Sequence, residues 1–190
     1  GGEPLLYPKL LSLVKILASA SIRCGISTNG TLVNKELALA LKRAGLDYIG
    51  ISLDGLKATH NRLRNSARAF SQALAGLKYA QGAGLKTGIR LTLNAYNYKN
   101  IKALFSLAEN LKVERLCFYH LVYSGRAKSS EGLDLTNLQR KKTIELIIDL
   151  TIAWIKRKIA TEVLTVDNFS DGAILLDIYA GKKARTILLY

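Results

Sequence analysis

The feature that most constrains the fold of this chain is a regular alternation between short strand-like segments and longer segments with helical spacing of apolar residues. The strand-like segments span residues 22–26, 48–53, 87–93, 115–122 and 161–166. Helices are expected over residues 5–17, 34–44, 70–82, 101–111 and 138–159, with one more within 172–184. Strands that alternate with helices of this length run parallel, with the helices as crossovers.

This alternation predicts an α/β fold, specifically a partial TIM-like (β/α) barrel of parallel strands, with an open doubly wound sheet as the alternative. A sandwich is disfavoured because the turn dipeptides Asn29-Gly30 and Asp54-Gly55 lead toward helices instead of joining adjacent strands. We expect residues 1–168 to form the barrel core and residues 169–190 to begin a C-terminal extension. The chain contains no methionine and ends on an apolar run, so we expect the barrel to be truncated at both ends.

The net charge of +14 raises the possibility of an anionic ligand. The lysines and arginines are scattered along the expected helices, which is typical of a solvated face, with a basic site for an anionic small molecule as the alternative. Nucleic-acid binding is disfavoured because no cluster of surface aromatic residues is evident for base stacking.

The chain also lacks the features of membrane and disulfide-rich proteins. No apolar run reaches the roughly 18 residues of a membrane-spanning helix. Cys24 and Cys117 cannot build a disulfide framework or a zinc site, so we expect a reducing cytoplasm and no metal ligands in this chain.

Polar residues gather after the expected strands, where β/α barrels carry their chemistry. They lie within residues 1–3, 27–29, 52–54, 90–94, 120–126 and 167–168. Gly1 and Gly2 would expose backbone groups to a ligand, and Glu3 would accept hydrogen bonds from an ammonium group. Ser52 and Asp54 suit the hydroxyl groups of a ribose.

The arginines and histidines of these segments suggest an acidic ligand. Arg64 and Arg90 have the forked geometry that binds carboxylates, and Arg90 lies within an apolar strand, where an unpaired charge is costly. Arg64 has a surface-loop role as its alternative. His60 is expected in a polar loop. His120, with Arg126 nearby, is expected to face the cavity, with a structural role as the alternative.

The order and spacing of four segments resemble motifs of the radical S-adenosylmethionine (SAM) superfamily over about the first 125 residues. They are Gly1-Gly2-Glu3-Pro4 (the GGEP motif), Ser27-Thr28-Asn29-Gly30 (the TNG turn), Ile51-Ser52-Leu53-Asp54-Gly55 (the fourth strand) and His60-Asn61-Arg62-Leu63-Arg64 (the HDxxR segment). In the last, Asn61 replaces an aspartate and Arg64 is shifted by one place. The resemblance implies SAM contacts from Gly1, Gly2, Glu3, Thr28, Asn29, Ser52, Asp54 and Val122.

Two further segments resemble radical SAM proteins of the NirJ and Ahb types, which modify heme precursors. Residues 118–126 are similar to an HLxYSGRG segment, and residues 165–172 are similar to TVDNHADG, with Phe169 where histidine is common. This implies a tetrapyrrole substrate whose acetates are removed or whose propionates are decarboxylated through a 5′-deoxyadenosyl radical. The implied substrate contacts are Arg64, Arg90, His120, Tyr123 and Arg126; catalytic residues remain unassigned.

The family holds a 4Fe-4S cluster through a CxxxCxxC motif that precedes GGEP. This chain carries only Cys24 and Cys117, so we expect the cluster ligands to lie outside it and the chain alone not to cleave SAM. An electron donor such as ferredoxin or flavodoxin is implied as a partner. The alternatives are a peptide-maturation or molybdenum-cofactor-type enzyme, a phosphate-binding barrel and a non-enzymatic basic binding module.

Overall fold

The computed structural model describes residues 2–123 and 131–180 and shows a parallel sheet with helical crossovers. Its five strands follow one another in chain order. They are β1 (Gly25–Thr28), β2 (Tyr48–Ser52), β3 (Lys86–Thr92), β4 (Arg115–Tyr119) and β5 (Glu162–Val166). Every neighbouring pair is parallel, so the predicted α/β class is confirmed.

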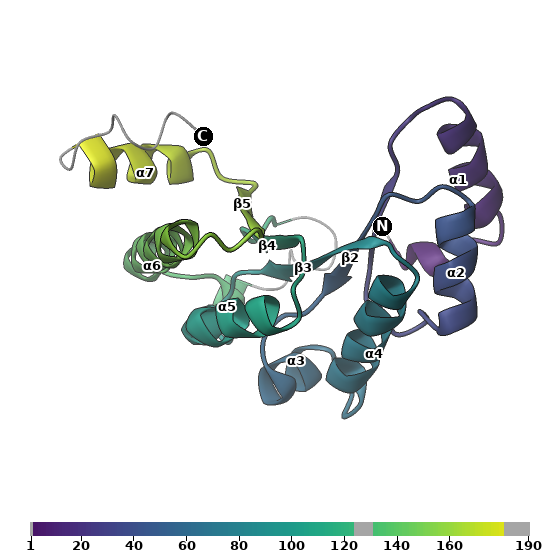
Figure 1. Ribbon diagram of the computed structural model, residues 1–190. Helices are drawn as coiled ribbons and strands as arrows, with labels where there is room; N and C mark the ends of the chain where they lie inside the picture. The colour runs from purple at the N-terminus through teal and green to yellow at the C-terminus, as the bar shows by residue number, and fades with distance from the viewer. Residues whose placement is uncertain (1, 124–130, 181–190) are drawn as a thin grey trace.

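The helices wrap around one side of the curved sheet (Figure 1). They are α1 (Leu10–Ser19), α2 (Lys35–Arg43), α3 (Lys57–Leu63), α4 (Ala69–Gly82), α5 (Ile101–Asn110), α6 (Asn137–Lys156) and α7 (Ser170–Ala180), with short 3-10 turns η1 (Pro4–Leu6), η2 (Tyr98–Asn100) and η4 (Glu131–Leu133). A doubly wound sheet would reverse its strand order and carry helices on both faces. The sequential order therefore supports the partial barrel.

The two faces of the sheet carry different side chains because successive residues of a strand point to opposite sides. The face toward the helices is apolar and buried, with Ile49, Ile51, Ile89, Leu91, Leu116 and Phe118. The opposite face carries Gly50, Ser52, Gly88, Arg90, Cys117 and Tyr119. This second face is continuous with the polar residues at the carboxyl ends of the strands.

Capping residues set the starts of two helices. Asn34 caps α2 as its side-chain oxygen accepts the backbone N–H of Leu37 at 2.8 Å. Thr136 and Gln139 form a reciprocal capping box at the start of α6. The first cap agrees with the helix start predicted from the sequence.

Several element boundaries differ from the sequence prediction. The first strand is β1 at Gly25–Thr28, not 22–26, and Ile22 is exposed. His60, which was expected in a polar loop, belongs to helix α3 and is 2% exposed. Strand β4 ends at Tyr119, not 122, because its ladder with β5 ends at the Tyr119–Val166 pair.

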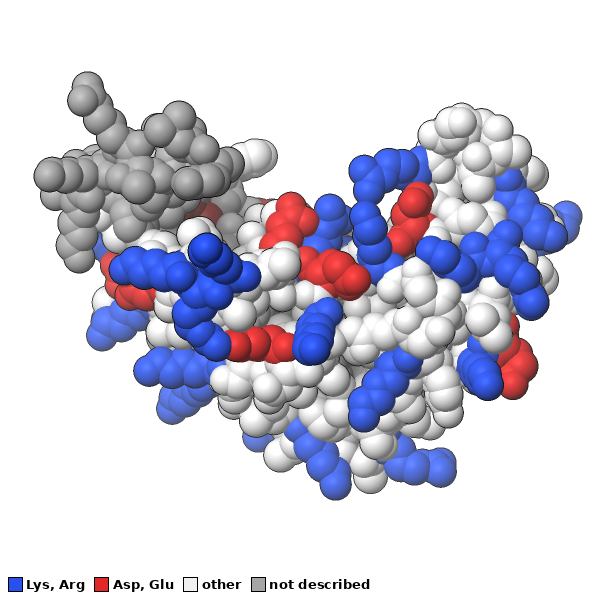
Figure 2. Space-filling view, in the orientation of Figure 1, with Lys and Arg blue, Asp and Glu red and all other residues white. Residues whose placement is uncertain are grey.

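Basic side chains are spread over the helices on the face that Figure 2 shows, without gathering into one patch. Both acidic and basic side chains are visible along the indented upper edge of this view. Within the part of the chain that the structure describes, no helix combines the length and apolar character needed to cross a bilayer.

Candidate functional site

A polar pocket of about 220 Å³ lies at the carboxyl ends of the central strands. Its lining residues come from β2, β3, β4 and the segment around α3, and they are Ser52, Asp54, Arg64, Arg90, Leu91, Thr92 and Tyr119. The structure therefore brings together four predicted site residues, Ser52, Asp54, Arg64 and Arg90. Ser52 and Arg90 are register partners on adjacent strands.

Arg90 is held in place by the residues that surround its aliphatic stem and its guanidinium group. The guanidinium carbon lies 4.5 Å from the centre of the Tyr119 ring, a cation–π distance. A Cβ atom at Gly50 would lie 2.4 Å from Cδ of Arg90, so the side chain needs a glycine there. No carboxylate pairs with Arg90 among residues 2–123 and 131–180. Its fork is therefore available to an anionic ligand.

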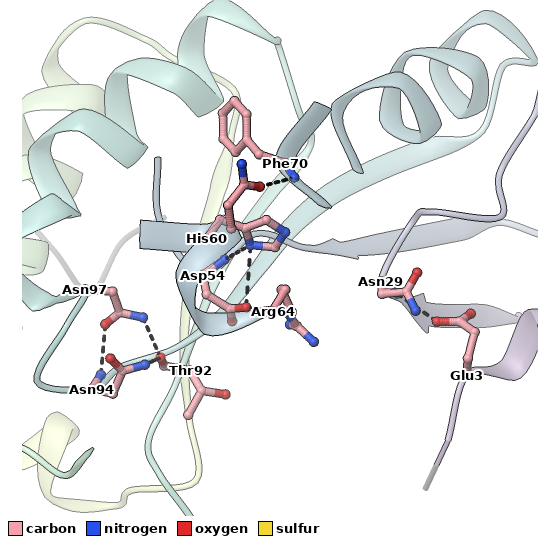
Figure 3. Close-up of polar contacts among 10 residues, drawn as sticks. Glu3, Asn29, Asp54, His60, Arg64, Phe70, Thr92, Asn94 and Asn97 are labelled. Carbon is pink, nitrogen blue, oxygen red and sulfur yellow. Dashed lines mark hydrogen bonds and ion pairs between the residues drawn. The ribbon is translucent and has the colours of Figure 1, made fainter. Parts of the chain in front are cut away.

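Asp54 is fixed by residues of α3 and its C-terminal end (Figure 3). The Arg64 Nε donates to Oδ2 of Asp54 at 2.6 Å, and the backbone N–H of Asp54 donates to Nδ1 of the buried His60 at 3.0 Å. Burial alone would raise the pKa of Asp54, but His60 and Arg64 lower it below its ordinary value overall. Asp54 thus lines the pocket as an ionised acceptor. His60 supports it from the core, not from a polar loop as predicted.

The loop after β3 is shaped by two asparagines (Figure 3). The side-chain amides of Asn94 and Asn97 both donate to the carbonyl oxygen of Thr92, at 3.0 and 2.8 Å. The side-chain oxygen of Asn97 also accepts the backbone N–H of Asn94 at 2.8 Å. These bonds fold the chain back directly behind the pocket residue Thr92. The buried Asn97 is absent from the predicted site residues.

Glu3 bridges the start of the chain to the end of β1 (Figure 3). Its Oε1 accepts the Thr28 hydroxyl at 2.5 Å and the backbone N–H of Leu5 at 3.2 Å, and its Oε2 accepts the backbone N–H of Asn29 at 2.9 Å. The Thr28 hydroxyl also accepts the N–H of Gly30. Thr28 is 3% exposed, so its hydroxyl serves this bonded cluster at the carboxyl end of β1. The cluster and the pocket residues at the carboxyl ends of β2, β3 and β4 together form the mouth of the sheet. Gly2 is exposed, and Asn29 is half-buried with its side-chain oxygen accepting the backbone N–H of Thr31 at 2.8 Å.

His120 does not lie in the pocket, and the prediction that it faces the cavity is wrong. Tyr119 lines the pocket, so the next residue points to the helix-covered face. There His120 is 7% exposed and its Nε2 lies 2.8 Å from Oδ2 of Asp171 on α7. Tyr119, and not His120, is the residue of this pair that lines the pocket.

Two more predicted residues lie outside the pocket lining. Val122 is 51% exposed and Tyr123 is 49% exposed, and both follow the end of β4. The Tyr123 hydroxyl donates to Oδ2 of Asp134 at 2.7 Å. Gly1 and Arg126 are outside the residues that the structure describes.

Deeper on the same face, Tyr48 and Cys117 lie below the pocket. Burial raises the pKa of the Tyr48 hydroxyl and of the Cys117 thiol above their ordinary values. A Cβ atom at Gly88 would lie 2.1 Å from the Tyr48 hydroxyl oxygen. The two side chains are therefore neutral packing groups at pH 7, and glycine makes room for one of them.

The chemistry of this mouth is that of a binding site for a polar ligand with hydroxyl and carboxylate groups. Comparison with known families gives a match of residues 1–108 to the radical SAM superfamily. The chain belongs to the radical SAM superfamily. The resemblance seen in the GGEP, TNG and ISLDG segments is thereby confirmed.

Two relatives concern tetrapyrroles. The chain is 42% identical over 175 residues to Fe-coproporphyrin III synthase of Methanosarcina barkeri, covering 92% of this chain and 44% of the relative. It is 33% identical over 178 residues to pre-heme d1 synthase of Dinoroseobacter shibae, covering 93% of this chain and 44% of the relative. The chain thus spans less than half the length of these relatives. The resemblance to NirJ- and Ahb-type proteins is confirmed, because these relatives are enzymes of that kind.

Solved structures support the fold. SuiB of Streptococcus suis bound to S-adenosylmethionine matches with a TM-score of 0.72 and 20% identity, over 95% of this chain and 39% of that chain. The coproporphyrinogen III oxidase HemN of Escherichia coli matches with a TM-score of 0.61 and 18% identity, over 83% of this chain and 39% of that chain. Both share the arrangement of strands and helices.

The side chains at the mouth fit SAM. In the part of the chain that the structure describes, Ser52 makes no side-chain hydrogen bond, and Asp54 is an ionised acceptor beside it. A hydroxyl and a carboxylate suit the ribose hydroxyls of SAM. Cluster ligands are a different matter, because the described residues contain no group of His, Cys, Asp or Glu arranged to hold a metal ion.

Proposed function

We propose that this chain is the SAM- and substrate-binding half-barrel of a longer radical SAM enzyme. Its substrate would be a tetrapyrrole. The enzyme would remove the acetate side chains of this tetrapyrrole or decarboxylate its propionate side chains. The observation that carries the substrate class is the Arg90 guanidinium, held against Tyr119 in the pocket without a carboxylate partner in the described residues. A buried or half-buried guanidinium without an anion is costly, so this arrangement favours a carboxylate ligand.

The residues at the mouth divide into two groups by their position. Gly2, Asn29, Ser52 and Asp54 would hold SAM, with Glu3 and Thr28 fixing the backbone around them. Arg90 would orient a substrate carboxylate, with Thr92 and Tyr119 beside it. Val122, Tyr123 and Arg126 follow β4, and we keep them as candidates for contacts to bound ligands.

When bound, SAM and a 4Fe-4S cluster supply the radical chemistry, and the protein supplies binding, orientation and exclusion of water. We assign the one-electron supply to a donor protein such as ferredoxin or flavodoxin. A cytoplasmic location fits the two buried, free cysteines of the chain.

The test uses the longer protein that contains this chain, reconstituted with iron and sulfide without oxygen and reduced with dithionite. We expect SAM to be cleaved to 5′-deoxyadenosine, together with a tetrapyrrole product that has lost acetate or carbon dioxide, as detected by mass spectrometry. SAM cleavage with a peptide or a nucleotide as the only modified substrate would contradict the tetrapyrrole assignment. The isolated chain of residues 1–190, treated identically, is expected to form no 5′-deoxyadenosine.

A further inference from the structure

A buried hydrogen bond joins the two segments that resemble heme-precursor enzymes. His120 follows β4 and Asp171 lies in the first turn of α7, and each is 7% exposed. Nε2 of His120 lies 2.8 Å from Oδ2 of Asp171. The other carboxylate oxygen, Oδ1, is buried and has no partner among the described residues. An isolated polar contact with an unsatisfied oxygen is costly inside a protein, so it calls for an explanation beyond packing.

The same point of the chain is also held through its backbone. The carbonyl of Tyr119 accepts the N–H of Leu93 at 2.8 Å, and the N–H of His120 donates to the carbonyl of Val166 at 3.1 Å. Asp167, between β5 and α7, has a φ of 70°, a left-handed conformation that few residues other than glycine adopt. The turn into α7 is therefore constrained, and α7 presents Asp171 to His120.

The two consecutive residues at this point face opposite sides of the sheet. Tyr119 extends into the pocket, where its ring lies 4.5 Å from the Arg90 guanidinium carbon. His120 extends to the helix-covered side, where Asp171 holds it. Because the two residues are consecutive, a shift of the backbone at His120 also displaces the backbone that carries the Tyr119 side chain.

We propose that His120 and Asp171 are positioning residues that set the Tyr119 ring and, through it, the Arg90 guanidinium. The inference rests on the proposed function in one respect, that Arg90 receives a substrate carboxylate. It replaces a direct substrate contact of His120 with an indirect role from the far face of the sheet.

The experiment compares Asp171→Ala, Asp171→Asn and a matched control in the longer, cluster-containing protein. The probe is iron-coproporphyrin III, and the measured quantity is its dissociation constant. Asp171→Ala removes the acceptor, and we expect the dissociation constant to rise about tenfold. A change of this size is typical of the interaction between two neighbouring groups. Asp171→Asn retains an oxygen that accepts the imidazole N–H, and we expect binding to stay within about twofold of wild type.

The control is Glu114→Ala, at the opposite end of β4. Glu114 Oε2 accepts the backbone N–H of Thr87 at 2.6 Å, so its loss destabilises the same sheet away from the pocket. We expect a lower melting temperature with unchanged probe affinity. Equal weakening by Glu114→Ala and Asp171→Ala would reduce the pair to a structural role and overturn the inference. If Asp171→Ala does not fold, His120→Asn takes its place in the experiment, because it removes the same imidazole–carboxylate contact.

A double-mutant cycle tests the path through Arg90. If the pair acts by way of Tyr119 and Arg90, adding Asp171→Ala to Arg90→Gln is expected to cause no further loss of affinity. Additive losses would overturn the inference.

A crystal structure of Asp171→Ala tests the geometry without any tetrapyrrole. A displaced Tyr119 ring supports the inference and an unchanged ring overturns it, even where the wild type binds no tetrapyrrole and the proposed function itself fails.

Discussion

The two faces of the sheet differ in what their side chains do, although the same strands supply both. The helix-covered face is filled by residues such as Ile51, Leu91 and Phe118, which are almost fully buried. The open face replaces these by Gly50, Arg90 and Tyr119, which leave space and charge at the strand ends. One face of the sheet therefore supplies stability, and the other supplies the candidate site. Substitutions on the two faces should therefore fail in different assays.

The largest effect on stability is expected from the helix-covered face. Phe118 is fully buried and its ring stacks on Phe105 with centroids 5.8 Å apart. Phe118→Ala should lower the free energy of unfolding by about 3–5 kcal/mol, because it removes apolar contacts and leaves a cavity. Urea denaturation measures this loss. Thr92→Ala on the open face should cost less than about 1 kcal/mol. Equal losses in the two variants would show that the two faces do not differ in their contribution to stability.

The next effect concerns the glycine below Arg90. Gly50→Ala places a methyl carbon 2.4 Å from the present position of Cδ of Arg90, so the Arg90 side chain must shift and we expect its guanidinium to move away from Tyr119. We expect tetrapyrrole binding to weaken by about tenfold, or about 1.4 kcal/mol. Gly82→Ala in α4 is the control, because its added Cβ meets no atom within 4 Å. Equal affinity in the two variants would show that Arg90 does not depend on Gly50.

A smaller effect is expected from the ionisation of Asp54. Its pKa is lowered in the folded chain, so the stability it contributes is complete above its ordinary pKa of 3.8 and is lost as pH falls through the lower, folded pKa. Asp54→Asn should therefore flatten the acid side of the stability curve while remaining less stable than wild type at pH 7. Urea midpoints between pH 7 and about pH 3 test this expectation. An unchanged slope in the variant would contradict it.

The sequence predicts more of the fold than of the site, for physical reasons. Alternation of strand and helix patterns is local, so the parallel sheet follows from it. Arg90 between Ile89 and Leu91 is likewise recognisable, because a charge flanked by core residues must face an opening. The orientation of His120 is not recognisable from the sequence, because Tyr119 and His120 are both compatible with either face of the sheet. Alternation counted outward from the buried Phe118 would place His120 with the helices.

Contacts between distant segments account for the remaining differences. Glu3 and Thr28 meet across 25 positions, and His120 and Asp171 meet across 51. The sequence does not indicate that the residues of each pair are partners. Polar residues of both pairs were therefore first interpreted as contacts to a ligand. Asn97 behind Thr92 is a similar case, since its buried amide satisfies backbone groups that only the folded loop brings together.

The most direct test of the central claim compares Arg90→Gln with Arg115→Gln in the longer protein. Both arginines lie on the open face, but Arg115 is at the other end of β4 and pairs with Glu162 at 2.6 Å. We predict that Arg90→Gln weakens iron-coproporphyrin III binding by at least about tenfold, while SAM binding and the affinities of Arg115→Gln stay near wild type. Loss of SAM binding with unchanged tetrapyrrole binding in Arg90→Gln would contradict the account, because it would assign the guanidinium to the cofactor and not to the substrate.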